Sequence, residues 1–176
     1  MRNRKLFKLE LLACALLLLF IVGCSAKVER KNGFDLSNSI IDVSKILAGG
    51  PPPDGIPAIN NPSFISAGDV DFLDDDDMVI GLVEKGKARV YPIRILIWHE
   101  IVNDNFLGLE IAVTYCPLCG TSMVFDRNVA GIKRTFGVSG LLYNSDVLLF
   151  DRQTKSLWSQ LGMQAISGPS VGKKLT

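Results

Sequence analysis

The chain has 176 residues, of which 48% are hydrophobic and 21% are charged, and its formal net charge is +1. This length allows one domain plus a leader. The sequence lacks a basic patch interleaved with aromatic residues, so nucleic acid is excluded as an expected partner. The 16 glycines and 8 prolines lie between short apolar runs, which favours a turn-rich β or α+β domain over a helical bundle.

Residues 1–23 are typical of an export signal. Basic residues precede the almost wholly apolar run Leu11–Val22, which is short for a bilayer-spanning helix of about 20 residues and suits a helical secretory signal. The run ends in Ile-Val-Gly before Cys24, and this end resembles a bacterial lipobox. The resemblance implies cleavage before Cys24 and a lipid on its thiol; an uncleaved signal anchor is the alternative.

A lipidated Cys24 predicts an extracytoplasmic protein held at the cell membrane or the outer membrane. Such a compartment tolerates disulfides. Apart from the lipidated residue, the cysteines of the exported chain are then Cys116 and Cys119. The redox state of this pair is therefore the main chemical question that the sequence raises.

Residues 24–49 are expected to be a tether, because their polarity is mixed and they end at the glycine- and proline-rich segment Gly49–Gly55. That segment cannot form a regular helix or an interior strand. Residues 50–176 are predicted to be an α+β domain, rich in hairpins and short strands and with one main helix. Its first hairpin is expected from Met78–Glu84 and Lys87–Tyr91.

Ile93–Val102 is predicted to be the main helix, because its apolar residues recur at helical spacing and Pro92 suits a first helical position. It contains the single histidine, His99, in a His-Glu-x-x-Asn string. This string lacks the second histidine of the zinc-protease signature, so that activity is excluded. His99 is either a structural histidine beside Trp98 or a proton acceptor or metal ligand near the cysteines.

The stretch Thr114–Arg127 is the candidate reactive site. Apolar runs flank Cys116-Pro117-Leu118-Cys119-Gly120, which predicts a strand, a tight turn and a second strand, with the two thiols facing each other. Such a pair can lock the turn as a disulfide, exchange electrons with a partner thiol, or bind copper or another soft metal. A complete cysteine-rich zinc site needs more ligands than one histidine and this pair provide.

Four polar residues are candidates for binding a cofactor from positions around the cysteines, outside the direct contacts of the thiols. They are Asn103, Tyr143, Asn144 and Asp146. The last three lie directly before the predicted strand Val147–Phe150. Asparagine and aspartate are equally typical of ordinary turns, so both interpretations of this string stay open.

Several strings resemble, together, the bacterial and archaeal family named domain of unknown function 3179. They are Gly-Gly-Pro-Pro with Asp54–Ala58, Tyr91–Leu96 with Trp98–Asp104, Thr114–Thr121, and Phe136–Asp146 with Leu157–Gln160. The resemblance extends from about Gly49 to Thr176 and implies an exported or membrane-anchored protein without an assigned biochemical role. Members usually run further, with an additional β-rich segment, so the chain is expected to be truncated at its C-terminus.

Two hypotheses for function follow. In the first, Cys116 and Cys119 of a membrane-anchored lipoprotein cycle with a disulfide or bind a soft metal, and His99 tunes thiol protonation. In the second, the protein is a non-catalytic binding module of the cell envelope. The pair is then a structural disulfide, and the region of Trp98 and Trp158 contacts a ligand. The sequence does not decide whether the protein is an enzyme.

Overall fold

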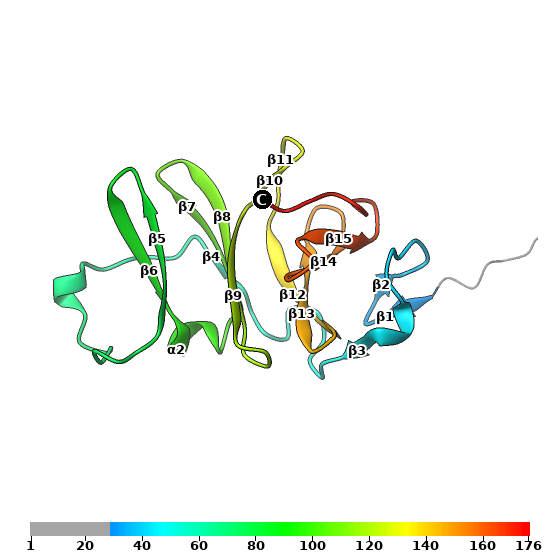
Figure 1. Cartoon of the computed structure of the whole chain (residues 1–176), viewed down its shortest axis with the longest axis horizontal. Coiled ribbons are helices and arrows are strands. Elements are labelled where there is room, and N and C mark those ends of the chain that lie inside the picture. Colours follow the sequence, from blue (N-terminus) through cyan, green and yellow to red (C-terminus); the bar gives the residue numbers. More distant parts are fainter. Residues whose placement is uncertain (1–28) are drawn as a thin grey trace, which may run out of the picture.

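A computed structural model describes residues 29–176 of the chain. The predicted signal segment 1–23 and the predicted lipidation site Cys24 lie outside this range. None of the helices within residues 29–176 is long and apolar enough to cross a bilayer. Most of the regular secondary structure in the described chain is β-strand, arranged as two larger sheets and three hairpins (Figure 1).

The first large sheet has five strands in the spatial order β15-β14-β13-β12-β3. Its strands are β3 (Ile46–Ala48), β12 (Phe136–Tyr143), β13 (Asp146–Asp151), β14 (Leu157–Ser159) and β15 (Gln164–Ser167). All of its neighbouring strands are antiparallel. Short connections join β12 to β13, β13 to β14 and β14 to β15, so most of this sheet is a local meander to which the distant strand β3 is added.

The second large sheet has four strands in the order β4-β7-β8-β9. Its strands are β4 (Ile59–Asn60), β7 (Ile101–Phe106), β8 (Leu109–Cys116) and β9 (Thr121–Asp126). Strands β7, β8 and β9 form an antiparallel meander, and β4 pairs with β7 in parallel. In Figure 1 this sheet lies beside the five-stranded sheet, between it and the β5–β6 hairpin.

The remaining strands form three hairpins, and the helical elements have three or four residues each. Three antiparallel hairpins are formed by β1 (Arg30–Lys31) with β2 (Phe34–Asp35), β5 (Val79–Glu84) with β6 (Lys87–Pro92), and β10 (Asn128–Val129) with β11 (Ile132–Lys133). The helical elements are η1 (Val43–Lys45), η2 (Ala67–Asp69) and α2 (Ile93–Leu96). The predicted hairpin around residues 85–86 is confirmed as β5–β6.

The prediction of an α+β fold with a main helix over Ile93–Val102 is wrong. The helix α2 ends at Leu96, Glu100 adopts a left-handed backbone (φ 58°), and Ile101 begins strand β7. Most of β7 is buried on both of its faces. Ile97 and Trp98, two of the apolar residues that fit helical spacing, are exposed in the turn between α2 and β7. The apolar pattern therefore runs through a short helix, a turn and the start of a strand, which periodicity alone does not separate.

Part of the segment expected to be a tether packs against the five-stranded sheet. Residues 30–48 contain β1, β2, η1 and β3, and β3 pairs with the end of β12. Phe34, Leu36 and Ile46 are buried in one cluster with Leu148 and residues of the neighbouring strands. These apolar side chains cover the face of the five-stranded sheet that points away from the other large sheet.

The principal core lies between the two large sheets. It contains Ile101 and Cys116 from one sheet and Phe136, Leu149 and Trp158 from the other. The Trp158 ring meets the Phe136 ring edge-on at a centroid separation of 5.7 Å. Burial of such large aromatic side chains removes much apolar surface from water and makes this layer a main source of stability.

Asn103 of β7 bridges the two sheets by hydrogen bonds. Its Nδ2 donates to the Phe136 carbonyl at 2.8 Å, and its Oδ1 accepts from the Phe136 N–H at 2.9 Å. Strand β3 pairs with β12 only from Leu141 to Tyr143, so the backbone of Phe136 has an open edge at this point. The buried side chain of Asn103 satisfies both backbone groups as a further strand would.

Replacement of Asn103 by alanine is expected to lower the free energy of unfolding by about 2 to 4 kcal/mol, because two buried backbone groups of Phe136 lose their partners. Urea unfolding followed by circular dichroism measures this change. The control is Asn128→Ala, because Asn128 is exposed and such a substitution typically changes stability by less than about 0.5 kcal/mol. Equal stabilities of the two variants would contradict the bridging role.

Candidate functional site

The cysteine pair lies at the tip of the β8–β9 hairpin, as the sequence predicted. Cys116 is the last residue of β8 and pairs with Thr121, the first residue of β9. The Gly120 N–H donates to the Cys116 carbonyl at 2.8 Å, and Gly120 has a positive φ of 68°. Glycine adopts this backbone conformation without the steric cost that a side chain would add. The tight turn therefore turns both sulfurs toward the same side of the hairpin.

A second hairpin tip lies next to the first. Strands β12 and β13 are joined by Asn144 and Ser145, whose φ angles are 51° and 66°. Two positive φ values in a two-residue loop define a type I′ turn, in which asparagine is favoured. This turn ends at Asp146, the first residue of β13, which is only 2% exposed.

The two tips bring three metal-ligating or titratable groups together. The sulfurs of Cys116 and Cys119 and a carboxylate oxygen of Asp146 all lie within 4.8 Å of one another. The Cys119 sulfur lies 3.4 Å from Asp146 Oδ1 and 3.0 Å from Thr121 Oγ1. The Cys116 thiol points to the Ser145 carbonyl at 3.8 Å. Both cysteines are free thiols.

The two thiols differ in their access to solvent. Cys116 is 1% exposed, whereas Cys119 is exposed. Burial, together with the hydrogen bond to the Cys119 side chain, raises the pKa of the Cys116 thiol to about 11. Cys116 therefore remains protonated at neutral pH, because the buried thiolate would lose its hydration. Cys119 is the sulfur that an external molecule can reach.

Buried polar side chains hold this group in position. The Thr121 hydroxyl donates to Gln160 Oε1 at 2.8 Å, and Gln160 Nε2 donates to Thr114 Oγ1 at 2.8 Å. The other oxygen of the Asp146 carboxylate, Oδ2, accepts from the Leu161 N–H at 3.1 Å. These contacts link β8, β9, β13 and the residues after β14. They leave little freedom for the carboxylate to turn away from the thiols.

The proton positions follow from the number of donors. A threonine hydroxyl has one proton, and the shortest contact of Thr121 is the one to Gln160. Thr121 is then an acceptor toward Cys119, and the Cys119 thiol is the donor toward Thr121 or Asp146. The Asp146 carboxylate is thus positioned to receive the proton of the exposed thiol.

His99 is not part of this three-residue group. Its Nδ1 lies 2.8 Å from the Pro57 carbonyl, and it belongs to the segment that precedes β7. The Tyr115 N–H donates to the Glu100 carbonyl at 2.8 Å, so His99 and Glu100 lie at the same edge of the four-stranded sheet as the cysteine turn. Glu100 is buried, and desolvation raises its pKa to about 7.

The other predicted residues have separate positions. Asp146 lies in the group, and Asn144 forms the adjacent turn, where it is exposed. Tyr143 is half-buried and pairs with Ile46 of β3. Asn103 bridges the two sheets, as described above. Trp158 is completely buried and donates from Nε1 to Asp151 Oδ2 at 2.8 Å, whereas Trp98 is 72% exposed.

Sequence reasoning missed three polar residues that support the site: the buried Thr114 and Gln160 and the half-buried Thr121. Thr114 and Thr121 flank the cysteine turn in the sequence. Gln160, by contrast, lies 39 positions from Thr121. Its place in the Leu157–Gln160 string of the family resemblance was the available signal.

Comparison with known proteins gives one result. A family model described as "Protein of unknown function (DUF3179)" matches residues 53–176. The match includes both hairpin tips and all residues of the three-residue group. No curated protein matches the chain, and no solved structure matches it.

We expect the two thiols to react at different rates. In the reduced protein at neutral pH, iodoacetamide should label Cys119 at least about tenfold faster than Cys116, because Cys116 is buried and its thiol is protonated. Mass spectrometry of the proteolytic peptides measures both rates. Above pH 11 in unfolding conditions the difference should vanish. Similar rates for the two thiols in the native protein would contradict the asymmetry.

Proposed function

Because the chain belongs to the DUF3179 family, whose description states no function, we propose a function from the site itself: Cys116 and Cys119 form a reversible dithiol–disulfide pair. One observation carries this proposal. An exposed thiol, a buried thiol and a buried carboxylate lie within 4.8 Å of one another. Such a group provides an attacking sulfur, a resolving sulfur and a proton acceptor.

In the proposed reaction, Cys119 attacks one sulfur of a disulfide in a partner protein. Asp146 accepts the Cys119 proton, and a mixed disulfide forms while the first partner sulfur leaves as a thiol after reprotonation. Cys116 then attacks the Cys119 sulfur, and its proton passes to the second departing sulfur. The Cys116–Cys119 pair is oxidised to a disulfide, and the partner disulfide is reduced to two thiols. The reverse sequence oxidises a dithiol partner.

The difference between the two thiols suits this order of events. Cys116 stays protonated in its buried position, so it does not compete for the external disulfide. Once the mixed disulfide forms, Cys116 is already beside the sulfur that it must attack. The intramolecular step then benefits from proximity, which converts a bimolecular encounter into a local one.

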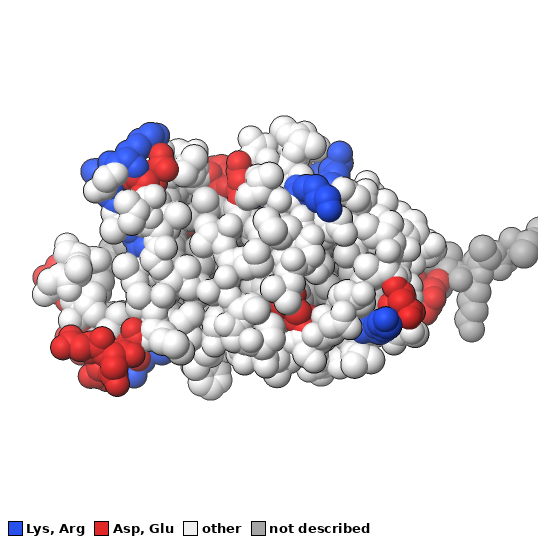
Figure 2. Space-filling view, in the orientation of Figure 1, with Lys and Arg blue, Asp and Glu red and all other residues white. Residues whose placement is uncertain are grey.

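The surface around Cys119 favours a protein as the partner. Leu118 is 67% exposed and Leu161 is 56% exposed, and both adjoin residues of the site. Figure 2 shows one face of the molecule, on which charged side chains gather mainly toward the ends and the middle is mostly uncharged. An apolar rim of this kind fits a protein surface better than a small hydrophilic thiol.

We also propose that the exchange takes place outside the cytoplasm, on a protein anchored to the membrane by lipid on Cys24. The apolar leader and the lipobox-like sequence support this location. An extracytoplasmic compartment contains the protein disulfides that the reaction requires.

A second candidate function is binding of a soft metal ion. The observation that favours it is the same cluster taken as ligands: two sulfurs and one carboxylate oxygen. Thiolates prefer soft ions such as Cu(I), and a carboxylate can complete a three-coordinate group with one side open to solvent. Binding would require both thiols to lose their protons, so affinity should fall as the pH falls.

The redox proposal predicts a reduction potential within the range of exchanging pairs, about −120 to −300 mV. Equilibration of the purified protein in glutathione buffers, followed by thiol alkylation and mass spectrometry, measures it. A structural lock would instead stay oxidised to potentials below about −300 mV. That result would leave the second of the two sequence-based hypotheses, the non-catalytic binding module.

Asp146→Asn tests the proton acceptor. It should slow reduction of a model protein disulfide near neutral pH by about tenfold or more, as expected for loss of a general base. The control is Asp75→Asn, because Asp75 is exposed and far in sequence from the cysteines. An unchanged rate in Asp146→Asn would remove the proposed role of the carboxylate, even if the disulfide still forms.

Metal binding is tested separately. The protein is purified under reducing conditions, loaded with Cu(I) and analysed for bound metal. The metal hypothesis expects one ion per chain, which should be lost in Cys119→Ser and weakened about tenfold or more in Asp146→Asn, as for other lost ligand contacts. Absence of bound copper in the wild-type protein, together with a reversible potential, would favour the redox function alone.

A further inference from the structure

A cavity lies on the other side of the four-stranded sheet from the main core. It has a volume of about 840 Å³ and is lined by β6, the segment 62–73, α2 and the strands β4 and β7. None of the residues that line it belongs to the cysteine site. Pockets for small molecules typically measure about 300 to 1,000 Å³, so this cavity has the size of a binding site.

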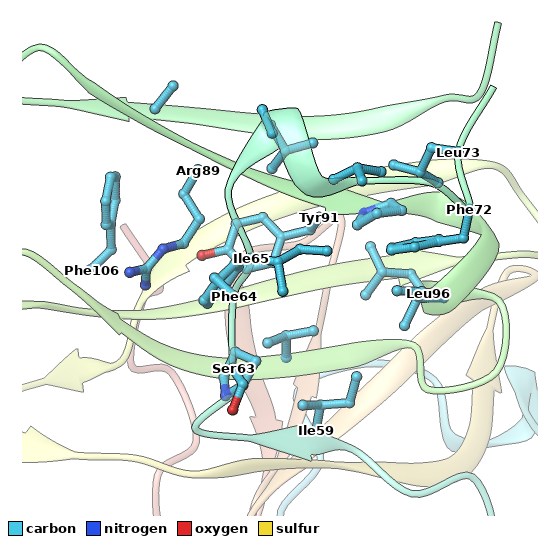
Figure 3. A pocket seen from close by; sticks show the side chains of 18 of the residues that line it. Ile59, Ser63, Phe64, Ile65, Phe72, Leu73, Arg89, Tyr91, Leu96 and Phe106 are labelled. Atoms are coloured by element: carbon cyan, nitrogen blue, oxygen red, sulfur yellow. The ribbon is translucent and has the colours of Figure 1, made fainter. Parts of the chain in front are cut away.

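The walls of the cavity are mainly apolar. Figure 3 shows Phe72, Leu73 and Leu96 together at one end, with Ile59 and Ile65 nearer the middle. Several of these side chains remain accessible in the described chain, including Ile65 at 59% and Phe72 at 43%. Apolar side chains gathered around a hollow in this way are typical of a ligand site.

The other end of the cavity is polar. The guanidinium carbon of Arg89 lies 4.1 Å from the centre of the Phe64 ring and 4.4 Å from that of the Phe106 ring. Arg89 Nη1 donates to Asp104 Oδ2 at 2.6 Å, and the Tyr91 hydroxyl donates to the same oxygen at 2.8 Å. Figure 3 shows Arg89 and the Tyr91 hydroxyl at the end opposite Phe72. The two rings and Asp104 thus fix the arginine in place.

Arg89 retains donors for a further partner. Its hydrogen bonds to described residues all come from Nη1, so Nε and Nη2 have no acceptor in this part of the chain. Lys87 also lines the cavity, and among the described lining residues the charged ones are Lys87 and Arg89, with no aspartate or glutamate. Asp104 lies behind Arg89 and offsets part of its charge, and Lys87 adds a positive charge that no described carboxylate pairs.

We infer that this cavity binds an amphipathic carboxylate of the fatty-acid type, with its aliphatic chain toward Phe72 and Leu96 and its carboxylate toward Arg89 and Lys87. The apolar end removes the chain from water, and the charge at the other end selects the sign of the head group. The inference is independent of the chemistry proposed for the cysteines, because the two sites share no residue.

Isothermal titration calorimetry with monomeric decanoate, decanol and decyltrimethylammonium tests the inference on the full chain. These probes share an aliphatic chain and differ in head-group charge. Decanoate should bind most tightly, decanol more weakly and the cation most weakly. Equal affinities for all three probes, or no binding of decanoate at millimolar concentration, would overturn the inference. Binding to phosphatidylglycerol vesicles without binding of decanoate would overturn it as well.

Two pairs of variants separate the contributions of charge and of the apolar wall. Lys87→Glu should weaken decanoate binding about fivefold and leave decanol binding unchanged. The matched control is Lys85→Glu, which reverses a charge on the same hairpin outside the cavity. Phe72→Ser should weaken both probes about fivefold, whereas Val83→Ser, at an exposed position outside the cavity, should change neither. Far-UV circular dichroism confirms that each variant is folded.

If Lys87→Glu and Phe72→Ser bind decanoate as tightly as the wild-type protein, the ligand is elsewhere and the inference fails. If Lys87→Glu lowers decanol affinity as much as decanoate affinity, the head group does not lie beside Lys87 and the proposed orientation fails.

Discussion

The packing of the five-stranded sheet against the four-stranded sheet brings the Asp146 carboxylate beside the thiols of Cys116 and Cys119. Each sheet contributes one hairpin tip, and neither tip alone contains both a thiol pair and a carboxylate. Asn103 holds the two sheets in register through the backbone of Phe136, and the buried Trp158 and Phe136 rings fill the space between them. A slip of β13 by one residue in its pairing register would turn its side chains to the opposite face and separate Asp146 from the thiols.

Burial gives this group its chemical asymmetry. Cys116 ends a strand whose side chains face the core, so its sulfur is desolvated and protonated, whereas Cys119 lies in the turn and meets solvent. The same sheet packing buries the Asp146 carboxylate, which is retained there because Leu161, Thr121 and Cys119 donate to it or contact it. A buried carboxylate without such partners would be costly.

The opposite face of the four-stranded sheet borders the cavity. There β6 and the segment 62–73 line a hollow beside a smaller buried cluster that includes Leu96, Val102 and Phe106. Arg89 joins this hollow to the buried Asp104 of β7. One sheet thus supports a thiol site at the edge where β8 ends and an apolar cavity on the face that does not contact the five-stranded sheet. The two sites share no residue, so a substitution can alter one site and leave the residues of the other unchanged.

The sequence by itself determined the local features: the cysteine hairpin, the β5–β6 hairpin and the family were all evident from short strings of residues. These depend on turn chemistry and alternation over a few positions, and such information is local. The sequence misled for Ile93–Val102, because its apolar residues fit helical spacing although Ile97 and Trp98 are exposed in a turn and Ile101 begins strand β7. Only the tertiary structure brings Asp146 beside the two thiols and Gln160 beside the threonines that flank the cysteine turn. Those contacts join residues at least 25 positions apart, and sheet packing, which no short string encodes, brings them together.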